Sequence, residues 1–364
     1  MKDNSPQIKN WLYPISFLYG IGVRLRNKLF DWNILKEKEY KLPIISIGNI
    51  TVGGTGKTPH TEYLIELLQT NYKVGILSRG YKRQSKGFVL ATENSTVQEI
   101  GDEPYQIKQK FPNAVVAVDA NRRQGIEKLL KLKEPVDLIL LDDAYQHRYV
   151  KPGLNILLTD YQRLICDDKL LPAGLLREPL RGKERANIVI VTKCTEEVKP
   201  IDFNIVAKRL DLYPFQKLFF SSFKYRDLRP VFATEEDYKS IKLSDIKEYN
   251  NVLLVAGIAN PQPLKDELSK HTDSLSCLVY KDHHNFLLKD LNEIEQTFNE
   301  LNGSNNLIVT TEKDAMRLLS TEGLSDSIKS SIYALPIEVQ ILQSKETLFN
   351  QNIFDYVKED KRNC

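Results

Sequence analysis

The residues best suited to chemistry form a glycine-rich segment at residues 46–59, which reads SIGNITVGGTGKTP. The segment follows a short apolar run and precedes a helical pattern, and in that context it indicates a phosphate-binding loop, or P-loop. Its glycines would let backbone N–H groups close around phosphate oxygens, Lys57 would reach the β- and γ-phosphates, and the Thr58 hydroxyl would bind Mg²⁺. The residues predicted to bind nucleotide are Thr51, Val52, Gly53, Gly54, Thr55, Gly56, Lys57 and Thr58.

One position departs from the usual pattern G-x-x-x-x-G-K-[ST]. The pattern expects a glycine at position 51, where this chain has Thr51. We therefore expect the loop to turn differently at its start, through Gly48 or through the pair Gly53 and Gly54. A glycine-rich turn without a ligand is the alternative, and the Gly-Lys-Thr sequence at a helix start argues against it.

An acidic signal follows at residues 136–143, VDLILLDD, where an apolar run ends in Asp142 and Asp143. A Walker-B carboxylate, which holds Mg²⁺ or its waters, comes at the end of such a strand. Two adjacent carboxylates are also costly to hold together without a cation nearby. A solvated acidic loop is the alternative, but it explains less beside a P-loop. The two segments together predict a phosphoryl-transfer site.

The elements that must position these residues alternate between short apolar runs and helical stretches, which is typical of a parallel sheet covered by helices. Strands are expected at 43–48, 74–77, 114–118, 138–141, 155–158 and 188–191, with a helix from 58 to 70 after the P-loop. At 217–232 two aromatic-rich segments flank a polar turn, which predicts a β-hairpin and a domain boundary. Further strands are expected at 252–256, 278–280 and 307–310.

Composition restricts the class of protein. A chain of 364 residues has room for two α/β domains. Its 51 Lys and Arg against 48 Asp and Glu give a net charge of +3, which excludes a histone-like or polyanionic protein. With 41% hydrophobic and 27% charged residues it is not a disordered chain. The four cysteines are scattered without a C-x-x-C pair, so neither a disulfide framework nor a structural zinc site is indicated, and a reducing compartment is expected.

The charge is concentrated at the N-terminus, where residues 1–41 carry eight Lys or Arg against four Asp or Glu. Within this part, residues 11–23 (WLYPISFLYGIGV) are uncharged and are followed by Arg24, Arg26 and Lys28. The run is shorter than the roughly 20 residues of a membrane span, and a signal peptide would place its positive charge before the apolar run. We predict an interfacial segment that contacts an anionic lipid surface. A helix packed on the protein's own core is the alternative.

Seven motifs then occur in order: GNITVGGTGKTP, SRGY (78–81), GDEP (101–104), DDAYQHR (142–148), LLREP (175–179), DHHNF (282–286) and TEKDA (311–315). From about residue 11 to about 320, this set resembles the tetraacyldisaccharide 4′-kinases, the lipid A 4′-kinases of Gram-negative bacteria, whose P-loop is itself atypical. The resemblance implies that ATP, with Mg²⁺, phosphorylates the 4′-hydroxyl of a lipid A disaccharide precursor, a tetraacylated glucosamine disaccharide 1-phosphate. It also implies a peripheral protein on the cytoplasmic face of the inner membrane.

The fold implied by the resemblance is α/β: a P-loop-type α/β/α sandwich and a second, smaller α/β domain, joined by a two-stranded β linker, with the site in the cleft between the domains. Four parts are therefore expected. They are the membrane-associating segment 1–40, the P-loop kinase domain 41–218, the β-hairpin linker 219–234 and the smaller domain 235–358.

Site residues are carried over from the same motifs. Beside Lys57, the resemblance assigns the catalytic base to Asp102 of GDEP and its partner to His283, chosen over His284 because it directly follows Asp282. The acidic group around Mg²⁺ is matched by Glu103, Asp142 and Asp143, together with Thr58. Substrate or phosphate binding is assigned to Tyr81, Arg122, Gln146 and Arg177.

These roles agree with the chemistry, because the proton of a sugar hydroxyl must pass to a positioned base as the phosphoryl group arrives. A carboxylate such as Asp102 suffices when the transition state is loose. Arg177, Arg181 and Arg185 would neutralise phosphate oxygens, and a solvated basic surface is the alternative. The alternative functions are a soluble P-loop small-molecule kinase or amidoligase, and a nucleotide-driven switch ATPase, which has no reason to carry GDEP and DHHNF. No nucleic-acid partner is expected, and a monomer is favoured.

Overall fold

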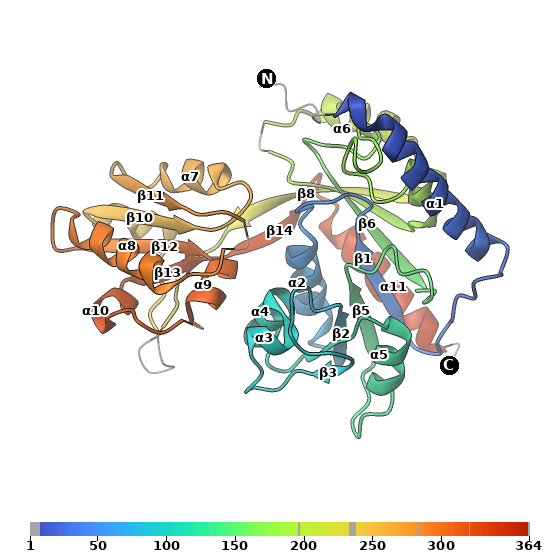
Figure 1. The fold of residues 1–364 in the computed structure, drawn as a ribbon, viewed down its shortest axis with the longest axis horizontal. Helices are drawn as coiled ribbons and strands as arrows, with labels where there is room; N and C mark the ends of the chain where they lie inside the picture. Colours follow the sequence, from blue (N-terminus) through green and yellow to red (C-terminus); the bar gives the residue numbers. More distant parts are fainter. Residues whose placement is uncertain (1–7, 196, 233–237, 283, 320, 363–364) are drawn as a thin grey trace. The chain divides into compact units, whose positions relative to one another are not determined.

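The structure, a computed structural model, describes residues 8–195, 197–232, 238–282, 284–319 and 321–362 (Figure 1). Contacts divide the chain into two compact units. The first unit comprises Met1–Asn94, Ile107–Phe223 and Val339–Cys364, and the second comprises Ser95–Gln106 and Lys224–Glu338.

The first unit is built on a nine-stranded sheet with the order β14-β8-β7-β6-β1-β5-β2-β4-β3. Its strands are β1 (Ile44–Gly48), β2 (Val74–Ser78), β3 (Val89–Leu90), β4 (Val115–Val118), β5 (Leu138–Asp142), β6 (Leu154–Asp160), β7 (Ile188–Thr192), β8 (Lys217–Tyr225) and β14 (Ile337–Ile341). From β4 to β8 along the sheet, neighbouring strands pair in parallel. Every residue of β1, β2, β5 and β7 is buried, which is why these strands read as continuous apolar runs. The strands expected between 43 and 191 are confirmed.

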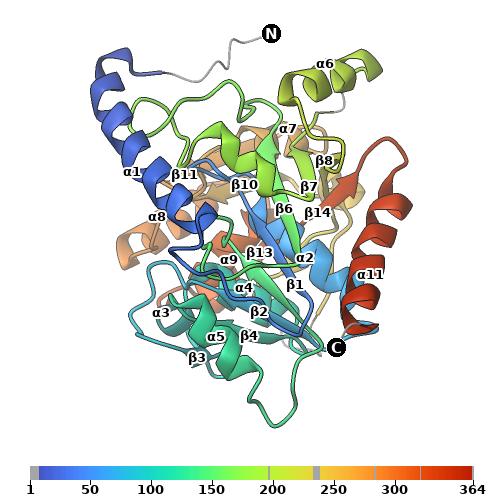
Figure 2. The same ribbon diagram turned by 90° about the vertical axis from the view of Figure 1, so that its right-hand side faces the viewer.

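Helices cover both faces of this sheet. They are α1 (Tyr13–Asp31), α2 (Lys57–Leu68), α5 (Arg122–Leu129), α6 (Pro200–Leu210) and α11 (Glu346–Arg362), with the short 3₁₀ helices η1 (Asn10–Leu12) and η2 (Leu180–Arg185). In Figure 2, α1 lies to one side of the strands and α11 to the other. The C-terminal helix is tied to the central strand, because the Tyr356 hydroxyl bonds both the N–H and the carbonyl of Ile44, at 2.9 and 3.1 Å.

The second unit contains a five-stranded sheet with the order β11-β10-β12-β13-β9. Its elements include β9 (Arg229–Pro230), β10 (Asn251–Ala256), β11 (Leu275–Val279), β12 (Asn306–Thr311), β13 (Ile332–Leu335), η3 (Leu243–Glu248), α3 (Val97–Ile100), α7 (Gln262–Leu268), α8 (Leu288–Asn299), α9 (Glu312–Leu319) and α10 (Asp326–Lys329). Alternate residues of β10 enter two different cores: Val252 and Leu254 pack with α7, whereas Leu253 and Val255 pack with α8. This unit is thus a three-layer α/β/α arrangement. Helix α4 (Asp102–Lys110) begins in the second unit and ends in the first.

The β-hairpin predicted at 219–234 is wrong. Strand β8 pairs with β7 and neighbours β14 in the large sheet, whereas β9 pairs with β13 in the small sheet. The chain therefore passes from the first unit to the second within β8 and returns within β14. Two strands do carry the connection, but the second comes more than a hundred residues later. As a result α11 belongs to the first unit and not to the predicted domain 235–358.

Helix α1 packs through Ser16, Gly20 and Phe30 and exposes most of its other large side chains. The Ser16 hydroxyl donates to the carbonyl of Leu170 at 3.0 Å and accepts from the N–H of Ala173 at 2.9 Å. A Cβ atom on Gly20 would lie 2.8 Å from the side chain of Leu170. Exposed apolar side chains in and beside this helix are Trp11, Tyr13, Ile15, Phe17, Leu18, Tyr19, Ile21, Leu25 and Trp32. In the described part of the chain, no helix has the length and apolar character needed to span a bilayer.

Candidate active site

The P-loop connects β1 to α2, and β1 lies between β5 and β6 in the sheet. Gly53 and Gly56 adopt φ angles of +110° and +84°, which only glycine adopts readily. Gly56 caps the N-terminus of α2, so the first residues of the helix, Lys57 and Thr58, follow directly. Their free N–H groups and the helix dipole favour an anion at this end. The predicted strand, loop and helix are confirmed here.

Position 51, where the usual pattern has glycine, pairs with the LLREP segment. Thr51 forms a β-bridge with Leu176, the N–H of Val52 donates to the carbonyl of Leu175 at 2.8 Å, and that of Arg177 donates to Ile50 at 2.7 Å. The loop therefore begins as a short extended pair with the LLREP motif, where a threonine fits. The turn comes at Gly53, as in the second of the two predicted alternatives, and Gly48 has no positive φ.

Further along, the loop is held by side chains from outside it. Asn49 donates to the Thr55 hydroxyl at 2.7 Å, and the hydroxyl of Thr192, the last residue of β7, donates to the carbonyl of Thr55 at 2.9 Å. All three side chains are buried. The loop is thus held in place by buried side chains outside it, which is the preorganisation that electrostatic stabilisation requires.

The two aspartates at the end of β5 have different environments. Asp142 is 1% exposed and accepts from the Thr61 hydroxyl of α2 at 3.2 Å. Asp143 is less buried and adopts a left-handed φ of +45°, a strained conformation of the kind found at functional sites. Its carboxylate lies 3.8 Å from the Lys57 ammonium and 3.1 Å from the Arg177 guanidinium. The predicted lysine, aspartate and substrate-binding arginine therefore come together.

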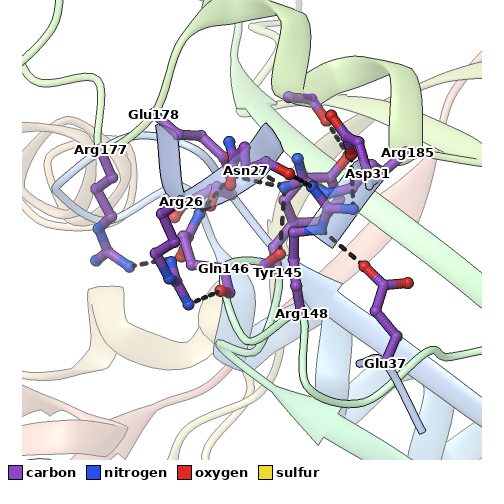
Figure 3. Close-up of polar contacts among 12 residues, drawn as sticks. Arg26, Asn27, Asp31, Glu37, Tyr145, Gln146, Arg148, Arg177, Glu178 and Arg185 are labelled. Atoms are coloured by element: carbon purple, nitrogen blue, oxygen red, sulfur yellow. Dashed lines mark hydrogen bonds and ion pairs between the residues drawn. The ribbon is translucent and has the colours of Figure 1, made fainter. Parts of the chain in front are cut away.

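Gln146 and Arg177 belong to one polar network (Figure 3). Gln146 accepts from Arg177 at 3.4 Å, and its amide donates to the carbonyl of Asn49 and to Glu178, the latter at 3.3 Å. Glu178 is 3% exposed and binds Arg185 through both carboxylate oxygens, at 2.8 and 2.9 Å. The Arg185 guanidinium in turn lies 4.8 Å from the centre of the Tyr145 ring.

The same network reaches helix α1. The Tyr19 hydroxyl donates to the carbonyl of Arg177 at 2.7 Å, Arg26 donates to the carbonyl of Gln146 at 3.2 Å, and Asn27 donates to Glu178 at 3.4 Å. Figure 3 shows Arg26 beside Gln146 and Asn27 among the same group. The predicted membrane-associating helix is therefore bonded to the segments that carry two predicted substrate-binding residues.

The three clustered arginines divide between the two interpretations. Arg177 lies in the site, and Arg185 is held by buried Glu178. Arg181 has a side chain that is 79% exposed and pairs with Glu184, so it belongs to the solvated surface.

The predicted substrate-binding residues Arg122 and Tyr81 differ in burial. Arg122 is 3% exposed and donates to the carbonyls of Asp119 and Asp142, at 2.8 and 3.3 Å.

Burial lowers the pKa of Arg122 to about 10. Because its guanidinium joins the ends of β4 and β5, it supports the strand ends that carry the site. Tyr81 is 66% exposed and follows β2, whose carboxyl end lies at the same sheet edge as that of β5.

The predicted base and its neighbour lie in the second unit. Asp102 is the first residue of α4, and its carboxylate binds the Arg317 guanidinium at 2.7 and 3.2 Å. Glu103 binds the Lys313 ammonium at 2.9 Å. Both partners come from α9, and Arg317 also binds buried Asp314 at 2.9 Å. Lys313 lies in the TEKDA motif, but the sequence predicted no role for it. Arg317, which lies just beyond that motif, was not predicted as a site residue.

The histidine assigned to Asp102, His283, lies outside the described residues. Its neighbour His284 bonds Asp290 at 2.9 Å and stacks on Tyr280, with the ring centres 4.7 Å apart. Asp290 lies in the first turn of α8, where its carboxylate also accepts from the N–H of the N-cap residue Leu287 at 2.8 Å. His284 thus has a structural role, and the pairing of His283 with Asp102 stays a prediction.

Mg²⁺ suits this site. It is held in kinases by one or two protein groups, phosphate oxygens and water, and not by a complete protein cage. Thr58 and Asp143 supply such groups beside the loop glycines. Among the residues that the structure describes, there is no group of three or more His, Cys, Asp or Glu side chains that could hold a metal ion. Glu103, the fourth predicted ligand, is bonded to Lys313.

Comparison with known proteins decides the family. A family model described as tetraacyldisaccharide-1-P 4′-kinase matches residues 8–356. The chain belongs to this family. Tetraacyldisaccharide 4′-kinases of Bacteroides fragilis and Bacteroides thetaiotaomicron are 58% and 56% identical to it, each over 100% of this chain and 97% of the relative. The resemblance read from the motifs is confirmed.

A solved member of the family shares the fold. The crystal structure of LpxK from Aquifex aeolicus, described as an "apo" form in complex with ATP, matches with a TM-score of 0.74. The two proteins are 28% identical, and the match covers 96% of this chain and 99% of that one. The predicted α/β fold class is therefore confirmed, and this family member was solved with ATP, the nucleotide that the sequence predicts.

Proposed function

We propose that this chain transfers the γ-phosphoryl group of ATP to the 4′-hydroxyl of a tetraacylated glucosamine disaccharide 1-phosphate. The observation that carries the proposal is the family match over nearly the whole chain, joined to an ordered P-loop whose lysine faces Asp143, which also binds Arg177. The reaction is that of a lipid A 4′-kinase.

The P-loop residues 51–58 are proposed to bind the phosphates of ATP. Lys57 would neutralise charge on the β- and γ-phosphates, while the loop N–H groups hold the oxygens in place. Thr58 and Asp143 are the proposed Mg²⁺ ligands, with Asp142 held behind them by Thr61. Mg²⁺ held by these residues would supply positive charge that offsets the charge developing on the transferred phosphoryl group.

Arg177 and Gln146 are proposed to bind the lipid substrate. In the described structure Arg177 is paired with Asp143, and a phosphate group would compete for the same guanidinium because Arg binds carboxylates and phosphates in the same geometry. Gln146 is held by Asn49 and Glu178, so its amide orientation is fixed. These two residues would place the disaccharide relative to the P-loop, which is the positioning on which phosphoryl transfer depends.

Asp102 is the proposed general base. Arg317 holds its carboxylate in one position at the start of α4, and Glu103 is held in the same way by Lys313. The Asp102 carboxylate would accept the proton of the sugar hydroxyl as the new P–O bond forms, and His283 would support it. Glu103 is proposed to assist around Mg²⁺ once its contact with Lys313 is exchanged.

We also propose that the protein sits on the cytoplasmic face of the inner membrane through α1. Phe17 and Leu18 are 63% and 68% exposed, and Trp11 is 77% exposed. Arg24 and Lys28 follow these apolar residues along the helix, and aromatic side chains with adjacent cations favour an anionic interface. A monomer suffices for this function.

The test is incubation of the purified chain with Mg·ATP and the acylated disaccharide 1-phosphate, followed by mass spectrometry of the lipid. We expect one added phosphate. Release of labelled γ-phosphate to water in the presence of the lipid, without phosphorylated lipid, would instead favour a switch ATPase and would overturn the proposal.

A further inference from the structure

His60 lies one turn inside α2, three residues after Lys57, and is 3% exposed. Both of its ring nitrogens are bonded. Nδ1 lies 2.7 Å from the carbonyl oxygen of Gly56, and Nε2 lies 3.0 Å from the hydroxyl oxygen of Ser221 on β8. A carbonyl can only accept, so Nδ1 carries the proton and Nε2 accepts from Ser221.

The neutral ring is the stable form at this place, because burial lowers the pKa of His60 to about 4. A single tautomer therefore persists at neutral pH. The Nδ1 contact to Gly56 is also much shorter than the helical one, in which the N–H of His60 approaches the same carbonyl at 3.3 Å. The imidazole is thus the closer partner of that carbonyl.

The Gly56 carbonyl matters because it belongs to the peptide that joins Gly56 to Lys57. In a trans peptide the C=O and the N–H point in opposite directions. Fixing the Gly56 oxygen toward His60 therefore fixes the Lys57 N–H toward the phosphate side of the loop. Gly56 needs this support, since its left-handed φ of +84° belongs to a residue with many accessible conformations.

Strand β8 contacts both Gly56 and His60 through its side chains. The Phe223 ring packs against Gly56, where an added Cβ would lie 2.7 Å from its edge, and it also contacts the His60 ring with centres 6.2 Å apart. Ser221 is fully buried and is held in register, because its carbonyl accepts from the N–H of Cys194 at 3.0 Å. The strand that continues into the second unit is therefore bonded to the phosphate loop through one histidine.

We propose that His60 is a positioning residue for ATP, which fixes the Gly56–Lys57 peptide for the phosphates and ties it to β8 through Ser221. This rests on the proposed kinase function and names a residue of the same site that neither the P-loop pattern nor the motif set assigns a role. His60 touches no substrate in this arrangement; it acts through the peptide that does.

Two substitutions separate its two contacts. In His60→Asn the amide nitrogen takes the place of Nδ1 and keeps the bond to Gly56, but the contact with Ser221 is lost. In His60→Gln the longer side chain reaches Ser221 and loses the bond to Gly56. Losing one hydrogen bond of this kind reduces affinity by about 3- to 10-fold. We expect His60→Gln to weaken ATP binding by that factor, and His60→Asn, which loses only the Ser221 contact, to weaken it by about two- to threefold.

The measurements are the Kd for ATP by calorimetry, with Mg²⁺ present and no lipid, and the KM values for ATP and lipid. The KM for lipid should stay within about twofold in both variants. Ile65→Val, a buried change in the same helix, is the control for general loss of packing and should leave the Kd for ATP unchanged. Equal Kd values for His60→Gln and His60→Asn, or equal increases in both KM values, would overturn the proposal.

If neither histidine variant folds, the Kd of Ser221→Ala for ATP tests the proposal instead. It keeps the ring and removes only the hydroxyl that orients it, so we expect a two- to threefold weaker Kd for ATP, and an unchanged Kd would overturn the link to β8. Because the Kd is measured without lipid, this result is independent of the lipid assay. A chain that failed to phosphorylate the lipid could still show the expected separation of ATP affinities.

Discussion

Replacing Glu178 with leucine tests how far the buried network supports the substrate side of the site. The carboxylate of Glu178 is bonded at 2.8 and 2.9 Å to Arg185, whose side chain is 23% exposed. In Glu178→Leu that guanidinium remains largely buried without its carboxylate. Breaking a buried pair by removing one partner costs about 3–5 kcal/mol.

The lower end applies here, because Arg185 is partly exposed and keeps its place over the Tyr145 ring and a bond to the Tyr145 carbonyl. We therefore expect the free energy of unfolding to fall by about 3 kcal/mol. With an m-value of about 3 kcal/mol per molar for a chain of this size, the urea midpoint should fall by about 1 M. Circular dichroism during urea titration measures it. Since Gln146 also loses a partner, the KM for lipid should rise.

Two control variants show whether the loss of stability in Glu178→Leu comes from the unpaired Arg185. In Arg181→Leu an exposed arginine of the same 3₁₀ helix loses only its contact with Glu184, and we expect a change below about 0.5 kcal/mol. In the double variant Glu178→Leu with Arg185→Leu no unpaired charge remains, so most of the stability should return. A midpoint for Glu178→Leu no lower than that for Arg181→Leu would refute the reasoning.

Three further outcomes are expected. Asp102→Asn should lower kcat by at least about 100-fold with an unchanged Kd for ATP, because an amide cannot accept the hydroxyl proton, and a kcat near that of the parent would remove Asp102 as the base. Phe17→Ser with Leu18→Ser should weaken binding to vesicles of anionic lipid by at least about tenfold at an unchanged Tm, since both side chains are exposed, and equal sedimentation with vesicles would argue against the interfacial role. The free energy of unfolding should fall as pH drops from about 6.5 toward 4, because burial lowers the pKa values of His60 and His147 to about 4, so the unfolded chain binds these protons first. His60→Asn should flatten that slope in part, and an identical pH profile would show that His60 is not one of the groups responsible.

The P-loop and the strands around it could be predicted because their signals are local. A strand buried on both faces reads as an apolar run, and a loop that needs left-handed φ angles needs glycine at Gly53 and Gly56. The pair Asp142 and Asp143 could be predicted in the same way, because it directly follows an apolar run. What the pattern could not supply was the difference between Asp142 and Asp143, which comes from Thr61 on one side and from Lys57 and Arg177 on the other.

Partners distant in sequence were beyond local reasoning. Asp102 binds Arg317, which lies 215 residues away in the sequence. The sequence around an arginine on an amphipathic helix does not indicate which carboxylate it binds. The hairpin prediction failed for the same reason. Adjacent aromatic-rich segments normally pair, but β8 has its neighbour in β14, which follows only after the whole second sheet.

The way in which β8 and β14 divide the chain also sets an order of events during synthesis. Most of the first unit, up to Phe223, emerges from the ribosome early, but β14 and α11, which close its sheet and tie Tyr356 to Ile44, are made only after most of the second unit. Nearly all residues of the inserted second unit are complete before then. The second unit is thus free to fold while the first still has an open sheet edge beside β8, and a growing chain with such an edge is prone to wrong pairing. The phosphate loop, whose support includes β8, would reach its final stability only after β14 and α11 have been added to the first unit.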